Sequence, residues 1–193
     1  MFAERADDET VTRLALAAKT GDRPAATRFI EVTHRDVHRF LAFLVHPGEA
    51  DDLTQETYLR AMRALPRFAA RSTARTWLLA IARRVAADHL RTASRRPPQT
   101  RLDDWQAAAE VAAFRQGGLG LDEQVALRDL LDGLAPARRE AFIATQLLGL
   151  SYTEAAQVCD CPVGTIRSRV ARAREDLVAG MRDSTHDGRR ATG

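Results

Sequence analysis

The most constraining pattern in this sequence lies between residues 149 and 176, where two helix signals flank a very short turn. Ser151, followed three residues later by Glu154, is typical of a capping box and predicts a helix that opens near Tyr152. The turn 159–162 follows and ends in a proline, whose fixed φ favours the first turn of another helix. Two helices joined by so short a turn predict a helix-turn-helix.

The second of these helices carries an arginine-rich face. Its apolar positions, among them Val163, Ile166 and Val170, recur at helical spacing and are expected to bind the helix to a domain core. Arginine offers two parallel N–H donors to guanine, and a recognition helix enters the major groove near its N-terminus. The pattern therefore predicts duplex DNA binding, which we favour over a merely solvated basic helix. The residues presented for this purpose are Thr165, Arg167, Ser168, Arg169, Arg172 and Arg174.

Apolar periodicity, interrupted by proline and glycine, predicts helices along the rest of the chain. Helices are expected over 11–45, with a break at Gly21-Asp22, and over 51–65, with Asp51 or Asp52 as the N-cap. A further helix is expected over 76–91, and two more precede the helix-turn-helix. Few stretches are rich in β-branched or aromatic residues, so the predicted fold class is all-α.

The stretch 96–121 differs in composition from both of its flanks. It has adjacent prolines near its start and three glycines near its end, which is typical of a flexible linker. We therefore predict two small helical domains, 10–95 and 122–182, the second a four-helix domain that contains the helix-turn-helix. Residues 183–193 are expected to form a disordered tail.

Positive charge is concentrated in one segment of the chain. The net charge of all 193 residues is only +3, whereas eight arginines against one aspartate give residues 67–96 a net charge of +7. A field this concentrated would attract a polyanion. Lys19 is the only lysine, as expected if a GC-rich genome encodes arginine in its place, so only the placement of the arginines is taken as functional.

Other classes of function find little support in the sequence. Cys159 and Cys161 are too few for a disulfide framework, and with His186 they fall short of the roughly four ligands of a zinc site. The chain has no phosphate-binding glycine loop, no HExxH and no nucleophile elbow, so we predict no enzyme activity, no metal and no cofactor. No apolar run approaches the ~18 residues of a membrane span, so we expect a cytoplasmic protein without membrane insertion.

Three motifs together resemble the extracytoplasmic-function (ECF) alternative sigma factors of bacterial RNA polymerase. The second DNA-binding domain of that family is similar to LSYTEAA (150–156) and CPVGTIRSRVARARE (161–175). Its polymerase-binding helix is similar to DDLTQETYLRAMRAL (51–65), and its promoter-melting segment to the stretch from Phe68 through TWLLAIARRVAADHLR. The resemblance covers about residues 10–180 in the family's order. It implies binding to core RNA polymerase and promoter-specific initiation through −10 and −35 elements.

The family's docking and −10 positions can be carried over residue by residue. By this resemblance, Asp52, Gln55 and Glu56 dock on the clamp helices of the largest polymerase subunit. The loop 68–75 captures a flipped-out promoter base, and Trp77 is expected in the core rather than on a base. The implied −10 DNA-binding residues are Phe68, Arg71, Arg75, Arg83, Arg84 and Arg91.

The same resemblance divides the arginine face of the last helix. Arg167, Ser168 and Arg172 match base-facing −35 positions, whereas Arg169 and Arg174 match positions that take phosphates or intrahelical partners. The polymerase flap is a further implied contact, and an anti-sigma factor, which holds many relatives, stays open as a partner. The main alternative is a stand-alone helix-turn-helix regulator, which would bind a twofold-symmetric operator tightly without polymerase.

Overall fold

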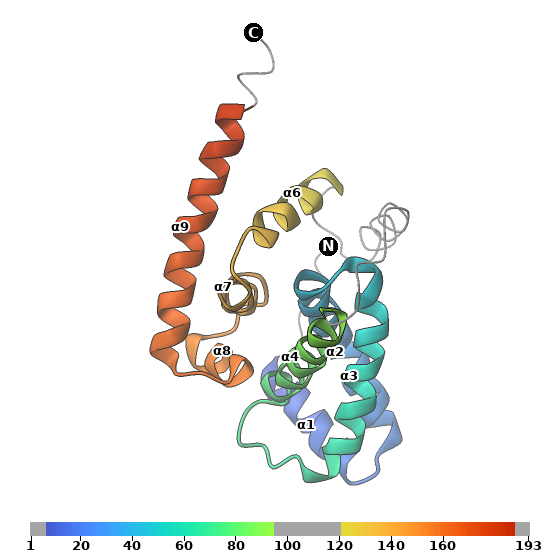
Figure 1. Cartoon of the computed structure of the whole chain (residues 1–193). Coiled ribbons are helices and arrows are strands. Elements are labelled where there is room, and N and C mark those ends of the chain that lie inside the picture. The colour runs from blue at the N-terminus through green and yellow to red at the C-terminus, as the bar shows by residue number, and fades with distance from the viewer. Residues whose placement is uncertain (1–6, 95–120, 188–193) are drawn as a thin grey trace. The chain divides into compact units, whose positions relative to one another are not determined.

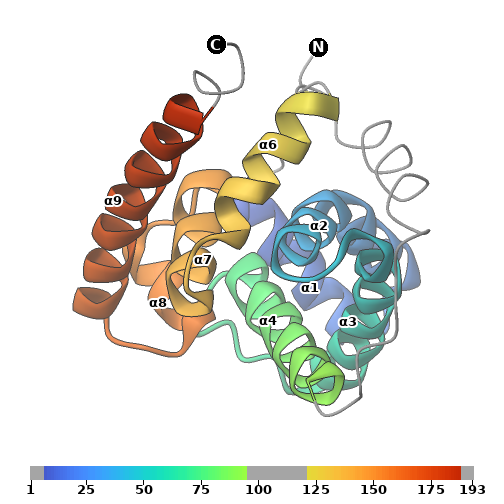
Figure 2. The same ribbon diagram turned by 45° about the horizontal axis from the view of Figure 1, so that its top comes forward.

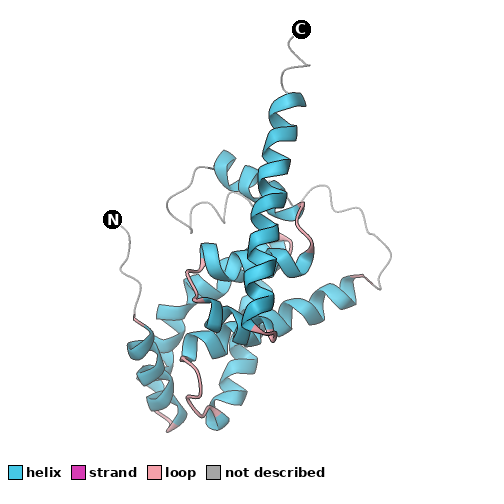
Figure 3. Ribbon diagram, turned by 90° about the vertical axis from the view of Figure 1, so that its left-hand side faces the viewer, coloured by secondary structure: helices cyan, strands magenta, loops and turns pink. Residues whose placement is uncertain are grey.

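The structure, a computed structural model, describes residues 7–94 and 121–187. These residues form helices joined by turns, with no strand among them, so the all-α prediction is confirmed (Figures 1 and 3). The chain divides into two compact units, Met1–Trp105 and Gln106–Gly193. Nearly all of the predicted linker lies outside the described residues. None of the described helices is both long enough and apolar enough to cross a bilayer.

Residues 7–94, the described part of the first unit, form four α-helices with short 3-10 turns before and after the third. The helices are shown in Figure 2. The expected break at Gly21-Asp22 is confirmed: Gly21 has a φ of +97°, and the Asp22 carboxylate accepts a hydrogen bond from the Ala25 amide at 2.9 Å, which caps the second helix. The elements are α1 (Asp8–Lys19), α2 (Arg23–Leu44), η1 (Pro47–Glu49), α3 (Ala50–Ala64), η2 (Leu65–Arg67) and α4 (Ala74–Ala93).

The core of the first unit lies between α2 and α4, which also pack against α1 and α3. Its largest fully buried side chains are Phe29, Phe40, Leu41, Leu78 and Leu79. A neutral polar pair also lies in this core: the Tyr58 hydroxyl is 2.8 Å from Thr33 Oγ1. Burial raises the pKa of the Tyr58 phenol well above its usual value, because the charged form would lose its hydration.

The predicted cap of α3 is wrong. The N-cap residue is Glu49, which makes no capping hydrogen bond with its side chain, and Asp51 and Asp52 lie within the first helical turn. The physical reason is that η1 leads directly into α3, so the backbone of Glu49 is already close to helical conformation. Both aspartates still lie where the helix dipole favours negative charge.

The second unit ends in the helix-turn-helix (Figure 1). Its core includes Leu131, Ile143, Val158 and Ile166, all fully buried. The last helix continues to Asp187, past the predicted tail start at residue 183, because residues 183–187 include neither glycine nor proline. The elements are α6 (Leu121–Asp132), α7 (Pro136–Phe142), the π-helical stretch η3 (Ile143–Leu147), α8 (Tyr152–Cys159) and α9 (Val163–Asp187).

The burial of Tyr58 predicts a loss of stability in alkaline solution. An unfolded tyrosine ionises near pH 10, and the folded Tyr58 pKa lies above that value, so this contribution is complete below pH 10 and falls as the pH rises further. Between pH 8 and pH 10.5 we expect the wild-type free energy of unfolding to fall by about 1 kcal/mol more than that of Tyr58→Phe. Urea unfolding of both proteins measures the difference, and parallel losses would contradict the prediction.

Candidate nucleic-acid interface

Local signals position the two helices of the helix-turn-helix. The predicted capping box is present: Ser151 Oγ accepts from the Glu154 amide at 3.2 Å, and Glu154 Oε2 accepts from the Ser151 amide at 2.8 Å. Asp160 then adopts a left-handed conformation with a φ of +51°, which ends α8. The Cys161 amide donates to the Ala156 carbonyl at 3.1 Å and closes the turn. The chain is thereby aimed into α9 two residues later.

One face of α9 is buried and the opposite face carries the predicted base-reading residues. Ile166, Val170 and Ala173 recur at spacings of four and three residues and are fully buried, so they bind α9 to the rest of its unit. The six predicted −35 residues lie between and after these buried positions. Four of these side chains are exposed, Arg167, Ser168, Arg172 and Arg174, and two are half-buried, Thr165 and Arg169. The structure therefore brings the predicted −35 residues to one surface, and their role stays a prediction.

Two arginines of this surface already have partners within the protein. Arg169 Nη1 lies 3.6 Å from the Cys161 sulfur, and Arg174 Nη2 donates to Gln146 Oε1 at 2.9 Å. Gln146 belongs to the π-helical stretch η3, and its own amide donates to Thr145 Oγ1 at 3.0 Å. Gln146 could not be predicted from the sequence, because a π-helical irregularity leaves no readable periodicity. Gln146 orients Arg174 from outside the recognition helix.

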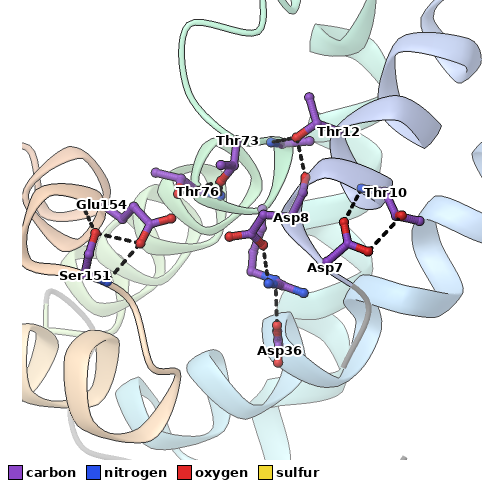
Figure 4. A network of polar contacts seen from close by, with 11 residues as sticks. Asp7, Asp8, Thr10, Thr12, Asp36, Thr73, Thr76, Ser151 and Glu154 are labelled. Carbon is purple, nitrogen blue, oxygen red and sulfur yellow. Dashed lines mark hydrogen bonds and ion pairs between the residues drawn. The ribbon is translucent and has the colours of Figure 1, made fainter. Parts of the chain in front are cut away.

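Two of the six residues predicted to contact the −10 element are buried instead. Phe68 is 3% exposed, and its ring centroid lies 4.9 Å from that of Trp77. Arg75 is also 3% exposed; it pairs with Asp8, and its Nε lies 2.9 Å from Asp36 Oδ2 (Figure 4). The prediction of direct DNA contact by Phe68 and Arg75 is corrected, because both side chains are already committed to the interior.

The other four arginines predicted to contact the −10 element lie at the surface. Arg71 and Arg84 are exposed, and Arg83 is half-buried. Arg91 is exposed and forms an ion pair with Asp88, which also binds Arg60 at 2.8 Å. The hydrogen bond from Arg60, which has the larger effect, and the hydrogen bond from Arg91 hold the pKa of Asp88 below its usual value. Part of the positive charge is therefore neutralised within the fold.

The predicted docking residues share the outer face of α3. Asp52 and Gln55 are exposed, and Glu56 is half-buried with its carboxylate 2.7 Å from Arg60 Nε. Beside them the large apolar side chain of Leu59 is 48% exposed. A groove of about 360 Å³ runs along this face and is lined by Ile30, His34, Asp51, Thr54, Gln55, Tyr58, Leu59 and Met62. The face thus combines acidic groups with an accessible apolar patch, as a protein interface does.

No metal-binding arrangement occurs in the part of the chain that the structure describes. Within residues 7–94 and 121–187, no three His, Cys, Asp or Glu side chains are grouped so that they could hold an ion. Cys159 is buried and Cys161 is half-buried, as expected for packed turn cysteines.

Comparison with known proteins gives matches over both units. The family descriptions Sigma-70 region 2 and Sigma-70, region 4 match residues 29–96 and 124–177. The chain is 52% identical over 179 residues to the ECF RNA polymerase sigma factor SigC of Mycobacterium tuberculosis, which covers 93% of this chain and 95% of the relative. It is 36% identical over 170 residues to the ECF RNA polymerase sigma-E factor of Escherichia coli K12, which covers 81% and 86%.

Solved structures give the same picture of the fold. The structure of CnrH in complex with the cytosolic domain of CnrY matches with a TM-score of 0.68 at 24% identity, over 92% of this chain and 99% of that one. The sigma factor RpoE of Bartonella quintana, in complex with the anti-sigma factor NepR, matches with a TM-score of 0.62 at 27% identity. That match covers 78% of this chain and 92% of RpoE.

The burial of Arg75 predicts a structural rather than a DNA-contacting phenotype. Arg75→Ala leaves the Asp8 and Asp36 carboxylates without this partner, so we expect the free energy of unfolding to fall by about 3 kcal/mol. The exposed Arg71→Ala is the matched control and should change it by less than about 0.5 kcal/mol. Urea unfolding followed by tryptophan fluorescence compares the two, and equal stabilities would refute the structural role.

Proposed function

Because the chain belongs to the extracytoplasmic-function sigma factors of bacterial RNA polymerase, we propose that it binds core polymerase and directs initiation at promoters read through their −10 and −35 elements. One observation carries the proposal: the chain has two different exposed surfaces. Arginines point outward from α9, and the outer face of α3 is acidic and partly apolar. The protein acts through binding alone, with no catalytic step of its own, in the cytoplasm where the chromosome lies.

The second domain, residues 122–182, reads the −35 element as duplex DNA. Arg167, Ser168 and Arg172 face base edges in the major groove, since they lie near the N-terminus of α9 and are exposed. Arg169 and Arg174 fix the position of α9 by contacting phosphates, which carry no sequence information. The hydrogen bond from Arg174 to Gln146 supports a positioning role for Arg174, because it restrains the guanidinium before DNA arrives.

The first domain, residues 10–95, holds the −10 element as separated strands. Its surface arginines Arg71, Arg83, Arg84 and Arg91 provide contacts to the DNA backbone. The loop after η2 receives an unpaired base, and unstacking one base costs a few kcal/mol that such contacts offset. With Phe68 turned inward, the exposed residues that the loop offers to the base are Ala69, Ala70 and Arg71, none of them aromatic.

The α3 face docks on the clamp helices of the largest polymerase subunit, and the polymerase flap is a further contact of the protein. Asp52, Gln55 and Glu56 supply polar contacts, and the exposed Leu59 beside them supplies the apolar contact. The Bartonella relative was solved with an anti-sigma factor, which supports an anti-sigma factor as a further partner class for this chain. These surfaces are those of a protein that functions as part of a larger complex.

In vitro transcription separates this function from that of a stand-alone helix-turn-helix regulator. With core polymerase and a genomic promoter library, the sigma factor produces transcripts that core polymerase alone does not. A stand-alone regulator would instead bind a symmetric operator tightly and leave initiation by core polymerase unchanged. Absence of any new start site, once a bound inhibitor has been removed, would overturn the proposal.

Replacing an α9 arginine should weaken −35 recognition in a base-dependent way. For Arg167→Ala or Arg172→Ala we expect a 5- to 150-fold loss, about 1–3 kcal/mol, confined to promoters with the base that the arginine reads. Holoenzyme binding to a set of single-base −35 variants measures the effect. Arg28→Ala, an exposed arginine of α2, is the control and should bind as the wild type does. A loss that is uniform across all sequences would assign the residue to phosphate instead.

Reversing the charge of the α3 face should abolish binding to core polymerase. In the double variant Asp52→Arg/Glu56→Arg, like charges replace attractive ones, and the ion pair of Glu56 with Arg60 is lost. We expect at least about a 100-fold loss of affinity in a pull-down with core enzyme and an unchanged helical circular dichroism spectrum. Glu175→Arg, exposed on α9, is the control that keeps binding. Undiminished retention of the double variant would refute the docking assignment.

A further inference from the structure

The segment between η2 and α4, residues 68–73, has buried or capped ends and an exposed tip. At one end the Phe68 side chain lies in the core, and at the other Thr73 caps α4. Residues 69–71 between them are exposed. Ala70 has a φ of +49°, in the left-handed region that alanine seldom adopts. The 68–73 loop therefore keeps a shape that its own residues do not prefer, and its ends have to impose that shape.

Helix α1 forms hydrogen bonds to both ends of the 68–73 loop. Lys19 Nζ, on the last turn of α1, donates to the Phe68 carbonyl at 2.8 Å. At the other end the Ala74 amide donates to Thr12 Oγ1 at 3.0 Å (Figure 4). The Thr12 hydroxyl donates in turn to the Asp8 carbonyl at 2.7 Å, so its lone pairs are oriented toward the amide. One rigid helix thus sets the distance between the two ends of the loop.

A third contact of α1 fixes the start of α4. Asp8 pairs with the buried Arg75, which Asp36 of α2 holds from the other side (Figure 4). Asp8, Thr12 and Lys19 are spaced by four and seven residues, so they lie along one face of α1. That face is turned toward the loop over the length of the helix. The contacts are therefore a property of how α1 packs and not of a single side chain.

We propose that α1 is a positioning element for promoter opening, in which Lys19 and Thr12 hold the 68–73 loop in the shape that receives an unpaired promoter base. The inference rests on the proposed function of this loop. It adds residues that precede position 29, where the match to Sigma-70 region 2 begins. A loop ordered before binding loses less conformational entropy when the base arrives, so its affinity for the base is greater.

The choice of residue at position 19 gives the proposal a specific chemical test. Lys19 is the only lysine among the 29 basic residues of the chain. Its ammonium is a compact donor on a flexible stem, and here it bonds a single carbonyl oxygen. Lys19→Met keeps the length of the stem and removes the donor, whereas Lys19→Arg keeps a charged donor. Thr12→Val keeps the shape of the side chain and removes the acceptor for the Ala74 amide.

The experiment measures the lifetime of holoenzyme on single-stranded oligonucleotides of the non-template −10 strand, from a promoter at which wild-type holoenzyme initiates. Each nucleotide is replaced in turn by an abasic one. For the wild type we expect one position at which base removal shortens the lifetime by about tenfold. We call this ratio of lifetimes, with and without the base, the abasic step. For Lys19→Met/Thr12→Val we expect about a tenfold shorter lifetime on the intact strand, and an abasic step of only about twofold.

Three controls keep the test specific to positioning. Arg13→Met removes a cation of α1 whose guanidinium bonds Thr10, and it should behave as the wild type. Lys19→Arg should restore the lifetime to within about threefold, because a charged donor is back in reach. Core binding and thermal stability are measured for every variant, and Lys19→Met alone is the fallback, since Lys19 is exposed and its loss spares the core.

The outcomes separate the inference from the function on which it rests. A folded, core-bound double variant that keeps the wild-type lifetime and the abasic step would overturn the positioning role. A shorter lifetime with the abasic step intact would also overturn it, because that result reports general weakening and not loop geometry. If wild-type holoenzyme itself shows no abasic step at any position, base capture by the loop fails, and the role of α1 fails with it.

Discussion

The first unit depends on one buried guanidinium. Arg75 lies at the start of α4, and its charge is shared by Asp8 of α1 and Asp36 of α2. An isolated charge at 3% exposure would carry a desolvation penalty of several kcal/mol, so the three helices must meet at this point for the fold to be stable. The pairing thereby fixes where α4 begins. The loop that precedes α4, and the surface that it presents, follow from that position.

In the second unit, local sequence signals rather than a buried charge fix where the helices begin and end. The Ser151–Glu154 capping box starts α8, and the left-handed Asp160 ends it. The buried stripe of Ile166 and Val170 then sets the rotation of α9 about its own axis. Since side chains on a helix keep fixed angular relations, that rotation also decides which arginines face outward. The predicted recognition surface is therefore specified by apolar residues that are themselves buried.

These two modes of specification explain what could be predicted from sequence. Caps, prolines, glycines and apolar spacing act over a few residues, so the helices, the helix-turn-helix and the outward face of α9 were all readable. The burial of Arg75 was not, because its partner Asp8 lies 67 residues away, and a sequence shows residue types without pairing them. The same limit applies to the hydrogen bond between Gln146 and Arg174 across 28 residues. The cap of α3 was misassigned because the η1 turn that replaces it has no distinct pattern.

Pairing of charges within the fold also changes the electrostatics of the basic segment. The count of eight arginines in residues 67–96 suggests a uniform basic surface. The fold places Arg75 inside, and it pairs Arg91 with an aspartate that also binds Arg60. Because an arginine paired within the fold offers less charge to a polyanion, the positive field of the described part of this segment comes mainly from exposed residues such as Arg71 and Arg84. A weaker and more localised field suits a protein that is held on DNA by polymerase, since tight binding by the free chain would sequester it on the chromosome.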